Sequence, residues 1–134
     1  MNDAANGCAS EETEQICLMR WAQLESGKYP ELKMLFHIPN GGKRGKAEAG
    51  RFKAMGVKPG VPDLFLPVAR RMDAYGTAYH RLFVEMKRQK GGRVSREQRE
   101  WMERLRQNGY AVLVCRGWEE AAECIQKYLE GRWV

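Results

Sequence analysis

Hydrophobic and polar residues follow two different spacings along this chain, and the spacings predict its secondary structure. Apolar residues three or four positions apart mark helices with one buried face. Shorter apolar or alternating runs, bounded by glycine, proline or asparagine, mark strands. The predicted helices span residues 10–26, 46–56, 95–109 and 117–130, and the predicted strands span residues 32–38, 63–68, 79–88 and 110–115.

Residues typical of helix ends support these bounds. Ser10 precedes a run of acidic residues, and a serine before acidic positions suits the start of a helix. Ser95, with Gln98 three positions later, matches the capping-box pattern. Gly56 and Gly109 close their helices, as glycine commonly does. Capping residues therefore support the helix ends, whereas the spacing of apolar residues supports the buried helix faces.

The order of these elements predicts an α/β fold with a mixed sheet flanked by helices. Strands 63–68 and 79–88 follow one another across a polar connection, so they should pair antiparallel as a hairpin. Strand 79–88 is followed by a helix and then by strand 110–115, which predicts a parallel pair. No repeat or linker divides the chain, so we expect a flexible tail over residues 1–9 and a single domain over residues 10–134.

Composition limits the class of protein. With 134 residues, 43% of them hydrophobic, the chain can bury one core of ordinary size. It has no apolar run of about 18 residues, and its first residues lack the basic start and apolar stretch of a signal peptide. The cysteines are too far apart for zinc-ligand spacing or a dense disulfide framework, which favours reduced thiols in a cytosolic protein. They are Cys8, Cys17, Cys115 and Cys124.

The formal charge of +6 is unevenly distributed and predicts a polyanionic partner. Residues 43–58 carry six basic side chains against one acidic side chain, Glu48. Residues 81–99 carry seven basic side chains against Glu85 and Glu97. Nucleic acid is the polyanion that such clusters most often bind. The alternative is an ordinary solvated basic surface.

Two carboxylates and a lysine occupy a predicted hairpin that otherwise looks buried. Because side chains alternate along a strand, Glu85 and Lys87 point the same way, and antiparallel pairing brings Asp63 beside them. Adjacent carboxylates repel one another unless a positive charge lies between them, and Mg²⁺ prefers such oxygen ligands. A metal ion there would activate water and neutralise charge on a phosphate. The alternative is a surface salt bridge between Lys87 and one of the acids.

Two of the predicted helices begin their apolar faces with a polar residue. Glu14 shares one helical face with Leu18 and Trp21, where an acid is unfavourable unless it is paired or bound to metal. Gln98 stands in the same relation to Trp101. This arrangement favours two helices that converge on one polar site. The alternatives are that Glu14 lies in solvent at the helix end and that Gln98 only completes the capping box.

In this order, these residues resemble the VRR-NUC domain, a branch of the PD-(D/E)XK nuclease superfamily. A Pro-Asp pair followed at a distance by Glu-x-Lys is the superfamily pattern, and it is met by Pro62-Asp63 and Glu85-Met86-Lys87. The segments GVPDLFL at 60–66 and VEMKRQKGGRVSREQREWMERLRQNGYAV at 84–112 are more specific to the branch. The resemblance covers nearly the whole chain.

The resemblance implies a fold, a reaction and a set of site residues. The fold would have the superfamily's αβββαβ core, and the activity would be cleavage of DNA phosphodiester bonds with Mg²⁺ or Mn²⁺. The implied catalytic residues are Glu14, Asp63, Glu85, Lys87 and Gln98. Asp63, Glu85 and the backbone carbonyl of Met86 would bind the metal ion, and Glu14 would reach it directly or through water. The resemblance implies neither a membrane nor a small-molecule cofactor.

The same resemblance implies a DNA-binding surface around the site. The segment HIPNGG at 37–42 is similar to a substrate-facing loop of the family, although a lone histidine is more often structural. The implied DNA-binding residues are Asn40, Lys43, Arg44, Lys46, Arg88, Lys90 and Arg93, with His37 as a further candidate.

A short member with no other domain attached is similar to the phage and bacterial versions, which would act in the cytoplasm in DNA repair or recombination. Those versions resemble Holliday-junction resolvases, which are homodimers, and a two-fold dimer suits the approximate two-fold symmetry of a four-way junction. Trp118, Trp133 and the outer side of helix 117–130 are candidates for the dimer interface. The alternative for these residues is ordinary core packing.

Three other functions stay open. The first is a nuclease for flap, nicked or linear DNA, which only a comparison of substrates can separate from a resolvase. The second is a catalytically silent DNA-binding module, which has no need for the combination of Glu14, Asp63, Glu85 and Lys87. The third is a protein that binds acidic partners through the same basic surface, which would not depend on metal.

Overall fold

A computed structural model describes residues 2–3, 8–39, 45–72 and 76–133. Three of the residues implied in DNA binding lie outside these ranges, namely Asn40, Lys43 and Arg44. Within the described part of the chain, no helix is long and apolar enough to cross a membrane.

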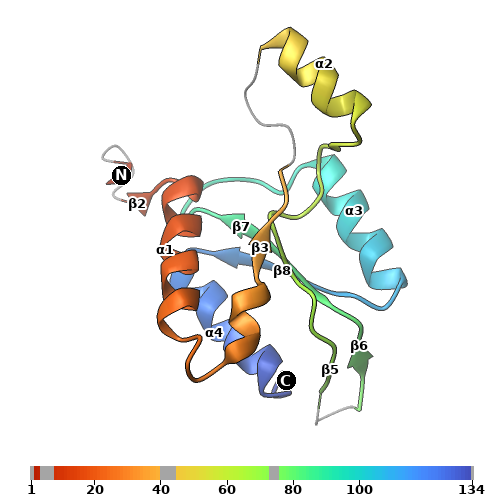
Figure 1. Ribbon diagram of the computed structural model, residues 1–134. Helices are drawn as coiled ribbons and strands as arrows, with labels where there is room; N and C mark the ends of the chain where they lie inside the picture. Colours follow the sequence, from red (N-terminus) through yellow and green to blue (C-terminus); the bar gives the residue numbers. More distant parts are fainter. Residues whose placement is uncertain (1, 4–7, 40–44, 73–75, 134) are drawn as a thin grey trace.

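A four-stranded mixed sheet forms the centre of the molecule, with strand order β3-β4-β7-β8 (Figure 1). The strands are β3 (Phe36–His37), β4 (Leu64–Leu66), β7 (Leu82–Lys87) and β8 (Ala111–Arg116). β4 pairs antiparallel with both β3 and β7, whereas β7 and β8 run parallel. The predicted hairpin and the predicted parallel pair are both confirmed.

Helices cover the two faces of the sheet unequally. α1 (Glu11–Leu24) and α4 (Trp118–Leu129) pack together on one face, and α3 (Arg96–Gln107) lies against the other (Figure 1). The core lies under α1 and α4, and alternate residues of β7 contribute their apolar side chains to it. They are Leu82, Val84 and Met86. The α/β class predicted from the order of elements is therefore confirmed, and the other three residues of β7 point toward α3.

The predicted strand at 32–38 is mostly wrong. Residues Pro30–Met34 form a 3₁₀ helix, η1, and only the two residues of β3 are extended. Proline fixes its own φ near the helical value and suits the first position of a helical turn. Leu32 and Leu35 are both buried, so the apolar residues in this segment repeat at three positions. That spacing brings both leucines to the core within a single turn.

The predicted strand at 79–88 is divided into two short strands. β6 (Ala78–Tyr79) pairs with β5 (Arg70–Arg71), whereas β7 begins at Leu82 in the main sheet. Between them, the His80 amide donates to the carbonyl oxygen of Gly109 at 2.9 Å. The backbone therefore stops pairing with β5 here and begins to pair with β4 and β8. The pattern of side chains could not predict this change.

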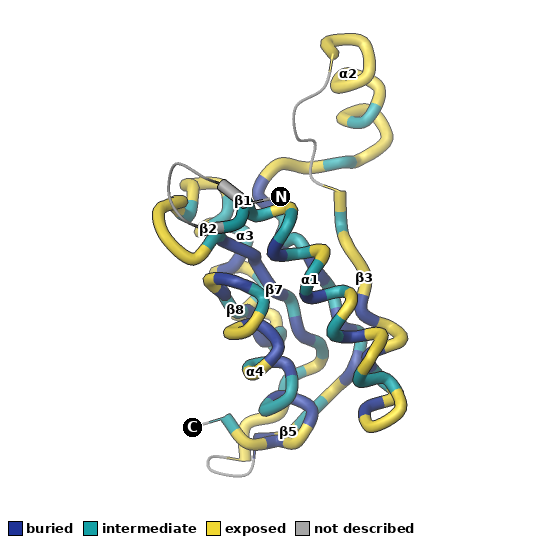
Figure 2. The backbone as a smooth tube through the Cα atoms, turned by 90° about the vertical axis from the view of Figure 1, so that its left-hand side faces the viewer, coloured by how far each residue is buried: buried dark blue, intermediate teal, exposed yellow. Residues whose placement is uncertain are grey.

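Two segments differ in kind from the main domain. Within the predicted tail, β1 (Asn2–Asp3) and β2 (Cys8–Ala9) form a two-residue ladder, and the flexibility of the tail stays a prediction. α2 (Lys46–Ala54) forms where predicted, but it has no buried residue and stands away from the sheet (Figures 1 and 2). Because α2 adds nothing to the core, it is a surface arm above the end of the sheet at which Lys87 lies.

The C-terminal aromatic residues pack inward. Trp118 and Trp133 are partly buried against the core, and the Trp133 ring lies 5.3 Å from Tyr128 and 5.5 Å from Tyr79 between centroids. These contacts fit the alternative of core packing, and a part for the two tryptophans in a dimer interface stays a prediction. Cys17, Cys115 and Cys124 carry free thiols, as predicted for these three cysteines.

We expect Gly60→Ala to destabilise the fold by about 1–3 kcal/mol. Gly60 has φ of +90°, and a Cβ there would lie 2.7 Å from the backbone of Glu97 in α3. Urea unfolding would measure the loss. The control is Gly50→Ala in α2, where a Cβ meets nothing within 4 Å and the change should add about 0.5–1 kcal/mol. Equal stability of the two variants would contradict the prediction.

Candidate active site

Asp63 and Glu85 face one another across the pair of strands β4 and β7. Leu64 pairs with Val84, so one further step along this antiparallel register places Asp63 opposite Glu85. Gly60 and the buried Pro62 lead the chain into this position against α3. The Asp63 Oδ2 atom accepts a hydrogen bond from the backbone amide of Met86 at 2.7 Å. The pairing that the hairpin pattern predicted therefore creates a pair of carboxyl groups.

Glu85 is almost completely buried, with 1% of its surface exposed. Its Oε2 atom accepts a hydrogen bond from the Gln98 side-chain amide at 2.9 Å and lies 3.4 Å from the Lys87 Nζ atom. Among the residues that the structure describes, none donates a hydrogen bond to the Oε1 atom. A buried oxygen without a donor is unfavourable unless a proton or a cation satisfies it.

Burial raises the pKa of Glu85 to about 8, and the nearby Asp63 carboxylate adds to the increase. Lys87 opposes it. Burial also raises the pKa of Asp63, although the Met86 amide works against this. The two carboxyl groups lie within hydrogen-bonding reach of each other, so a protonated Glu85 can donate to Asp63. The pair therefore retains one proton near neutral pH unless another positive charge replaces it.

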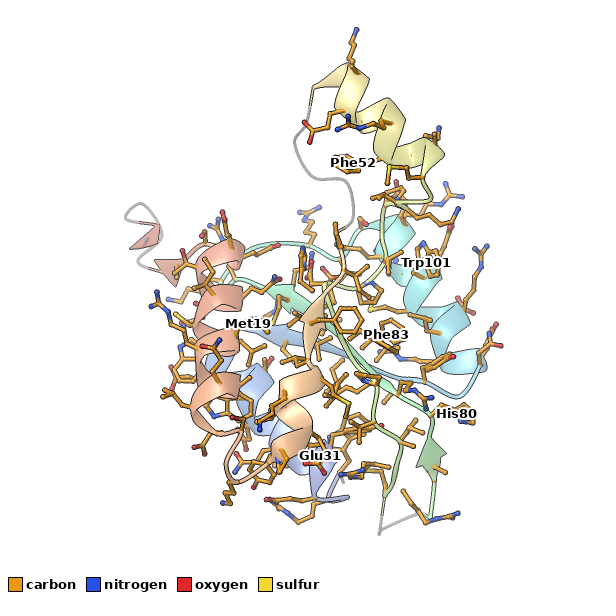
Figure 3. The ribbon with its side chains drawn as sticks, in the orientation of Figure 1. Met19, Glu31, Phe52, His80, Phe83 and Trp101 are labelled. Atoms are coloured by element: carbon orange, nitrogen blue, oxygen red, sulfur yellow. The ribbon has the colours of Figure 1, made fainter. Side chains whose placement is uncertain are left out.

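Gln98 has both of the roles that the sequence left open. Its side-chain oxygen accepts a hydrogen bond from the backbone amide of Ser95 at 2.8 Å. The Ser95 hydroxyl accepts one from the backbone amide of Gln98 at 3.1 Å, which completes the capping box of α3. The Gln98 side-chain oxygen also accepts from Lys87 Nζ at 3.1 Å, while the NH₂ group of Gln98 donates to Glu85. In Figure 3, Phe83 on β7 and Trp101 on α3 mark the side of the sheet on which these contacts form.

We expect Gln98→Ala to lower the free energy of unfolding and to remove the hydrogen bond that holds the Lys87 ammonium group in place. The change removes half of the capping box and one partner each from Lys87 and Glu85, so it should cost about 1–3 kcal/mol in thermal or urea unfolding. Ser95→Ala is the matched control, because it removes a cap of about 1 kcal/mol without touching Lys87. If both variants lose equal stability, the contacts of Gln98 with Lys87 and Glu85 add nothing beyond the helix cap.

In the structure, Glu14 makes its hydrogen bonds to residues other than the facing carboxyl groups. Glu14 is 1% exposed, so the alternative of a solvent-exposed helix end is wrong. Its Oε2 atom accepts from the Gln89 side chain at 3.1 Å, and its Oε1 atom accepts from the Trp118 backbone amide at 2.9 Å. Those contacts lie where α1 meets the start of α4. The expectation that two helices converge on one polar site holds for α3, whereas the described hydrogen bonds take Glu14 elsewhere.

A cleft of about 430 Å³ opens beside Asp63 at the start of α1. Its lining residues come from α1, β3, β7 and the residue before β4, and they are Glu11, Glu12, Gln15, Ile16, His37, Asp63 and Met86. Sequence reasoning missed Glu11, Glu12 and Gln15. The acidic first turn was visible, and Glu11 and Gln15 share a helical face, but the pattern could not show which side of the turn meets the sheet.

His37 lies at the edge of this cleft. Its Nδ1 atom is 2.9 Å from the backbone oxygen of Asp63 and 3.1 Å from the Gln15 side-chain nitrogen. The Asp63 oxygen can only accept and the Gln15 nitrogen can only donate, so the tautomer of the ring decides which of the two hydrogen bonds Nδ1 makes. His37 is exposed, and its part in DNA binding stays a prediction.

The described basic candidates surround this end of the molecule. Lys46 is exposed at the start of α2, and Lys90 and Arg93 are exposed in the loop after β7. Arg88 is half-buried, with its Nε atom donating to the Lys90 carbonyl oxygen at 2.9 Å. The sheet end that carries Asp63 and Lys87 is thus flanked by positive charge.

Comparison with known proteins identifies the family to which the chain is similar. The model of the VRR-NUC domain family matches residues 9–119, which is most of the chain. The chain belongs to the VRR-NUC domain family. A solved structure described as a VRR_NUC domain protein superposes with a TM-score of 0.74 at 30% sequence identity, covering 91% of this chain and 89% of the other. No match was found among curated proteins.

Membership makes this VRR-NUC domain part of a nuclease family, with a PD-(D/E)XK-like fold and a general dependence on divalent metal. The site residues fit such an ion in chemical type, because Asp63 and Glu85 supply hard oxygen ligands, and no residue in the described part of the chain donates a hydrogen bond to Glu85 Oε1. Among the described residues, no group of three or more histidine, cysteine or acidic side chains has a metal-binding arrangement. Backbone oxygen, water or substrate would therefore have to complete the coordination.

Proposed function

We propose that this VRR-NUC domain is a metal-dependent endodeoxyribonuclease that cleaves branched DNA, and that it acts as a homodimeric Holliday-junction resolvase in the cytoplasm of a bacterial or phage-infected cell. The observation that carries the nuclease proposal is a buried Glu85 oxygen, beside the Asp63 carboxyl group, to which none of the described residues donates a hydrogen bond. A silent DNA-binding module would gain nothing from two facing acids that raise each other's energy.

Asp63 and Glu85 would hold Mg²⁺ or Mn²⁺, with the Met86 carbonyl oxygen as a further ligand. When bound, such an ion supplies a water of lowered pKa and neutralises charge on the phosphate. Lys87 presents its ammonium group beside Glu85, where it stabilises negative charge on the attacking oxygen or on the phosphate. Gln98 holds Lys87 and Glu85 together, so that both keep their positions as charge develops.

The helix acids that line the cleft with Asp63 are Glu11 and Glu12. They extend the negative side of the cleft toward solvent, which favours a cation there and disfavours a bare phosphate. His37 would direct its Nε2 atom at the DNA backbone. Lys46, Lys90 and Arg93 would bind phosphates on either side, because basic groups of this kind fix DNA without reading its bases. Specificity would then come from the shape of the DNA.

A homodimer is proposed on symmetry, because two equal active sites suit the two equivalent strands of a four-way junction. The rival reading is a nuclease for flaps, nicks or linear duplex, which needs only one active site for each event. Both readings predict the same chemistry at Asp63, so the choice of substrate is the observation that separates them.

The test uses end-labelled four-way junction, 5′ flap, nicked and linear duplex DNA, each incubated with Mg²⁺, Mn²⁺ or EDTA. Asp63→Asn tests the site, and Glu103→Gln, at an exposed acid on α3, is the matched control. Paired symmetric nicks in the junction, lost with Asp63→Asn and in EDTA, together with a dimeric mass in light scattering, are expected. Cleavage of flap or linear DNA alone would retain the nuclease and reject the resolvase. Binding without cleavage would reject the enzyme.

A further inference from the structure

Both oxygens of the Glu14 carboxylate are already engaged by the protein. Oε1 accepts the backbone amide of Trp118, the first residue of α4, and Oε2 accepts the side-chain amide of Gln89. The amides at a helix start carry partial positive charge and have no partner inside the helix, so a carboxylate is well placed there. If Glu14 turned away, the Trp118 amide would lose this acceptor.

The same contacts reach the backbone that carries Lys87. The Gly117 amide donates to the carbonyl oxygen of Lys87 at 2.9 Å. Gly117 has φ of +87°, and a Cβ there would lie 2.8 Å from the Gln89 Cγ atom. Gln89 and Gly117 are therefore closely packed, and Glu14 binds Gln89 itself and the residue after Gly117. One buried carboxylate thus connects α1, α4 and the end of β7.

The hydrogen-bond partners of Glu14 differ from those of the carboxyl pair. Glu14 comes from α1 and meets the start of α4, and these helices cover one face of the sheet (Figure 1). The side chains of Glu85 and Lys87 contact Gln98 of α3, which covers the other face. The α1 carboxylates that share a cleft with Asp63 are those of Glu11 and Glu12.

From this arrangement we infer that Glu14 is a positioning residue, which fixes the start of α4 and the end of β7 so that Lys87 is held in place, and that it is not a ligand of the metal ion. The inference rests on the proposed nuclease function for its kinetic consequence. Its structural part, the cap on α4, stands without that function.

Two substitutions at this position give different results under the two roles. In Glu14→Gln, the amide oxygen can still accept from Trp118, and its NH₂ group can donate to a Gln89 side chain that has turned over. A positioning role therefore survives in Glu14→Gln and is lost in Glu14→Ala. A metal ligand loses its charge in both variants, as it does in Asp63→Asn.

The experiment measures Mn²⁺ affinity by calorimetry, unfolding temperature, and kcat and KM for the cleaved DNA. We expect Glu14→Gln to keep Mn²⁺ affinity and kcat within about threefold of wild type. Glu14→Ala should lower the unfolding temperature by several degrees and kcat at least tenfold, measured well below the unfolding temperature, with Mn²⁺ affinity and KM little changed. Asp63→Asn should lose Mn²⁺ affinity at least tenfold.

Two results would overturn the inference. One is a loss of Mn²⁺ affinity in Glu14→Gln that equals the loss in Asp63→Asn, because that marks a ligand. The other is a Glu14→Ala variant with unchanged stability and kcat, because nothing then depends on the cap. If wild type neither binds Mn²⁺ nor cleaves DNA, the proposed function fails, and the unfolding temperatures of Glu14→Ala and Glu14→Gln still decide whether Glu14 holds α4.

Discussion

Replacing Glu85 by glutamine should lower DNA cleavage by about 10²–10³-fold or more while making the metal-free protein more stable above pH 8. The glutamine retains the shape of the side chain and can still bond to Gln98 and Lys87. Burial and the nearby Asp63 carboxylate make a negative charge on Glu85 unfavourable, and they raise its pKa to about 8. The glutamine side chain cannot carry this charge. Cleavage assays at saturating Mg²⁺ and urea unfolding in EDTA at pH 9 would measure the two effects.

The control for this prediction is Glu100→Gln. Glu100 is an exposed acid of α3 that pairs with Arg96 at 3.0 Å, so its loss should change stability by less than about 1 kcal/mol and leave cleavage intact. A Glu85→Gln variant that cleaves DNA at the wild-type rate would exclude Glu85 from the reaction. A variant that loses stability at pH 9 would show that the Glu85 charge is well compensated in the folded protein.

Without divalent metal, stability should fall as the pH rises from about 5 to about 9. The folded-state pKa of Glu85 is raised from 4.5 to about 8, so the folded protein binds this proton more tightly than the unfolded chain does. The stabilisation is complete below pH 4.5 and is lost as the pH passes through about 8. The raised pKa of Asp63 acts in the same direction. The expected loss is on the order of 5 kcal/mol.

Mn²⁺ should reverse this dependence, because a cation replaces the proton between the two acids. At about 100 times its dissociation constant, a ligand of the folded state adds about 2.7 kcal/mol. Urea unfolding at pH 5, 7 and 9, with Mn²⁺ and with EDTA, would measure both effects. Glu85→Gln should flatten the metal-free dependence. A wild-type stability that rises with pH in EDTA would have the wrong sign for a buried, protonated pair.

The chemistry of the site could be predicted from residue type and spacing. Strand periodicity put Glu85 and Lys87 on one side of β7, and the hairpin put Asp63 opposite them, because local steric rules fix which way side chains point along a strand. The capping box at Ser95 was equally local. The family resemblance implied the αβββαβ core, and the order of helices and strands predicted from the patterns agreed with it, although Pro30–Met34 form a 3₁₀ helix over much of the predicted first strand.

The roles of the α1 acids needed the tertiary structure. Glu11, Glu12 and Glu14 lie within one helical turn, and the apolar face of α1 could not show which of them meets the cleft and which meets α4. That choice depends on how α1 packs against α4 and β7, which involves residues about 75 to 104 positions away. Similarly, the sequence left open whether Gln98 only caps α3 or also reaches the polar site. The structure shows that it does both.

Sequence alone determined the class of fold, the pairing of β4 with β7, and the acids and lysine that this pairing brings together, because each follows from backbone geometry over a few residues. Only the tertiary structure decided that Glu85 is buried with one oxygen that receives no hydrogen bond from the described residues. It also decided that Glu14 accepts the first amide of α4, and that Trp118 and Trp133 pack against the core. Burial and long-range hydrogen bonds depend on which elements pack together, and that packing is a property of the whole chain.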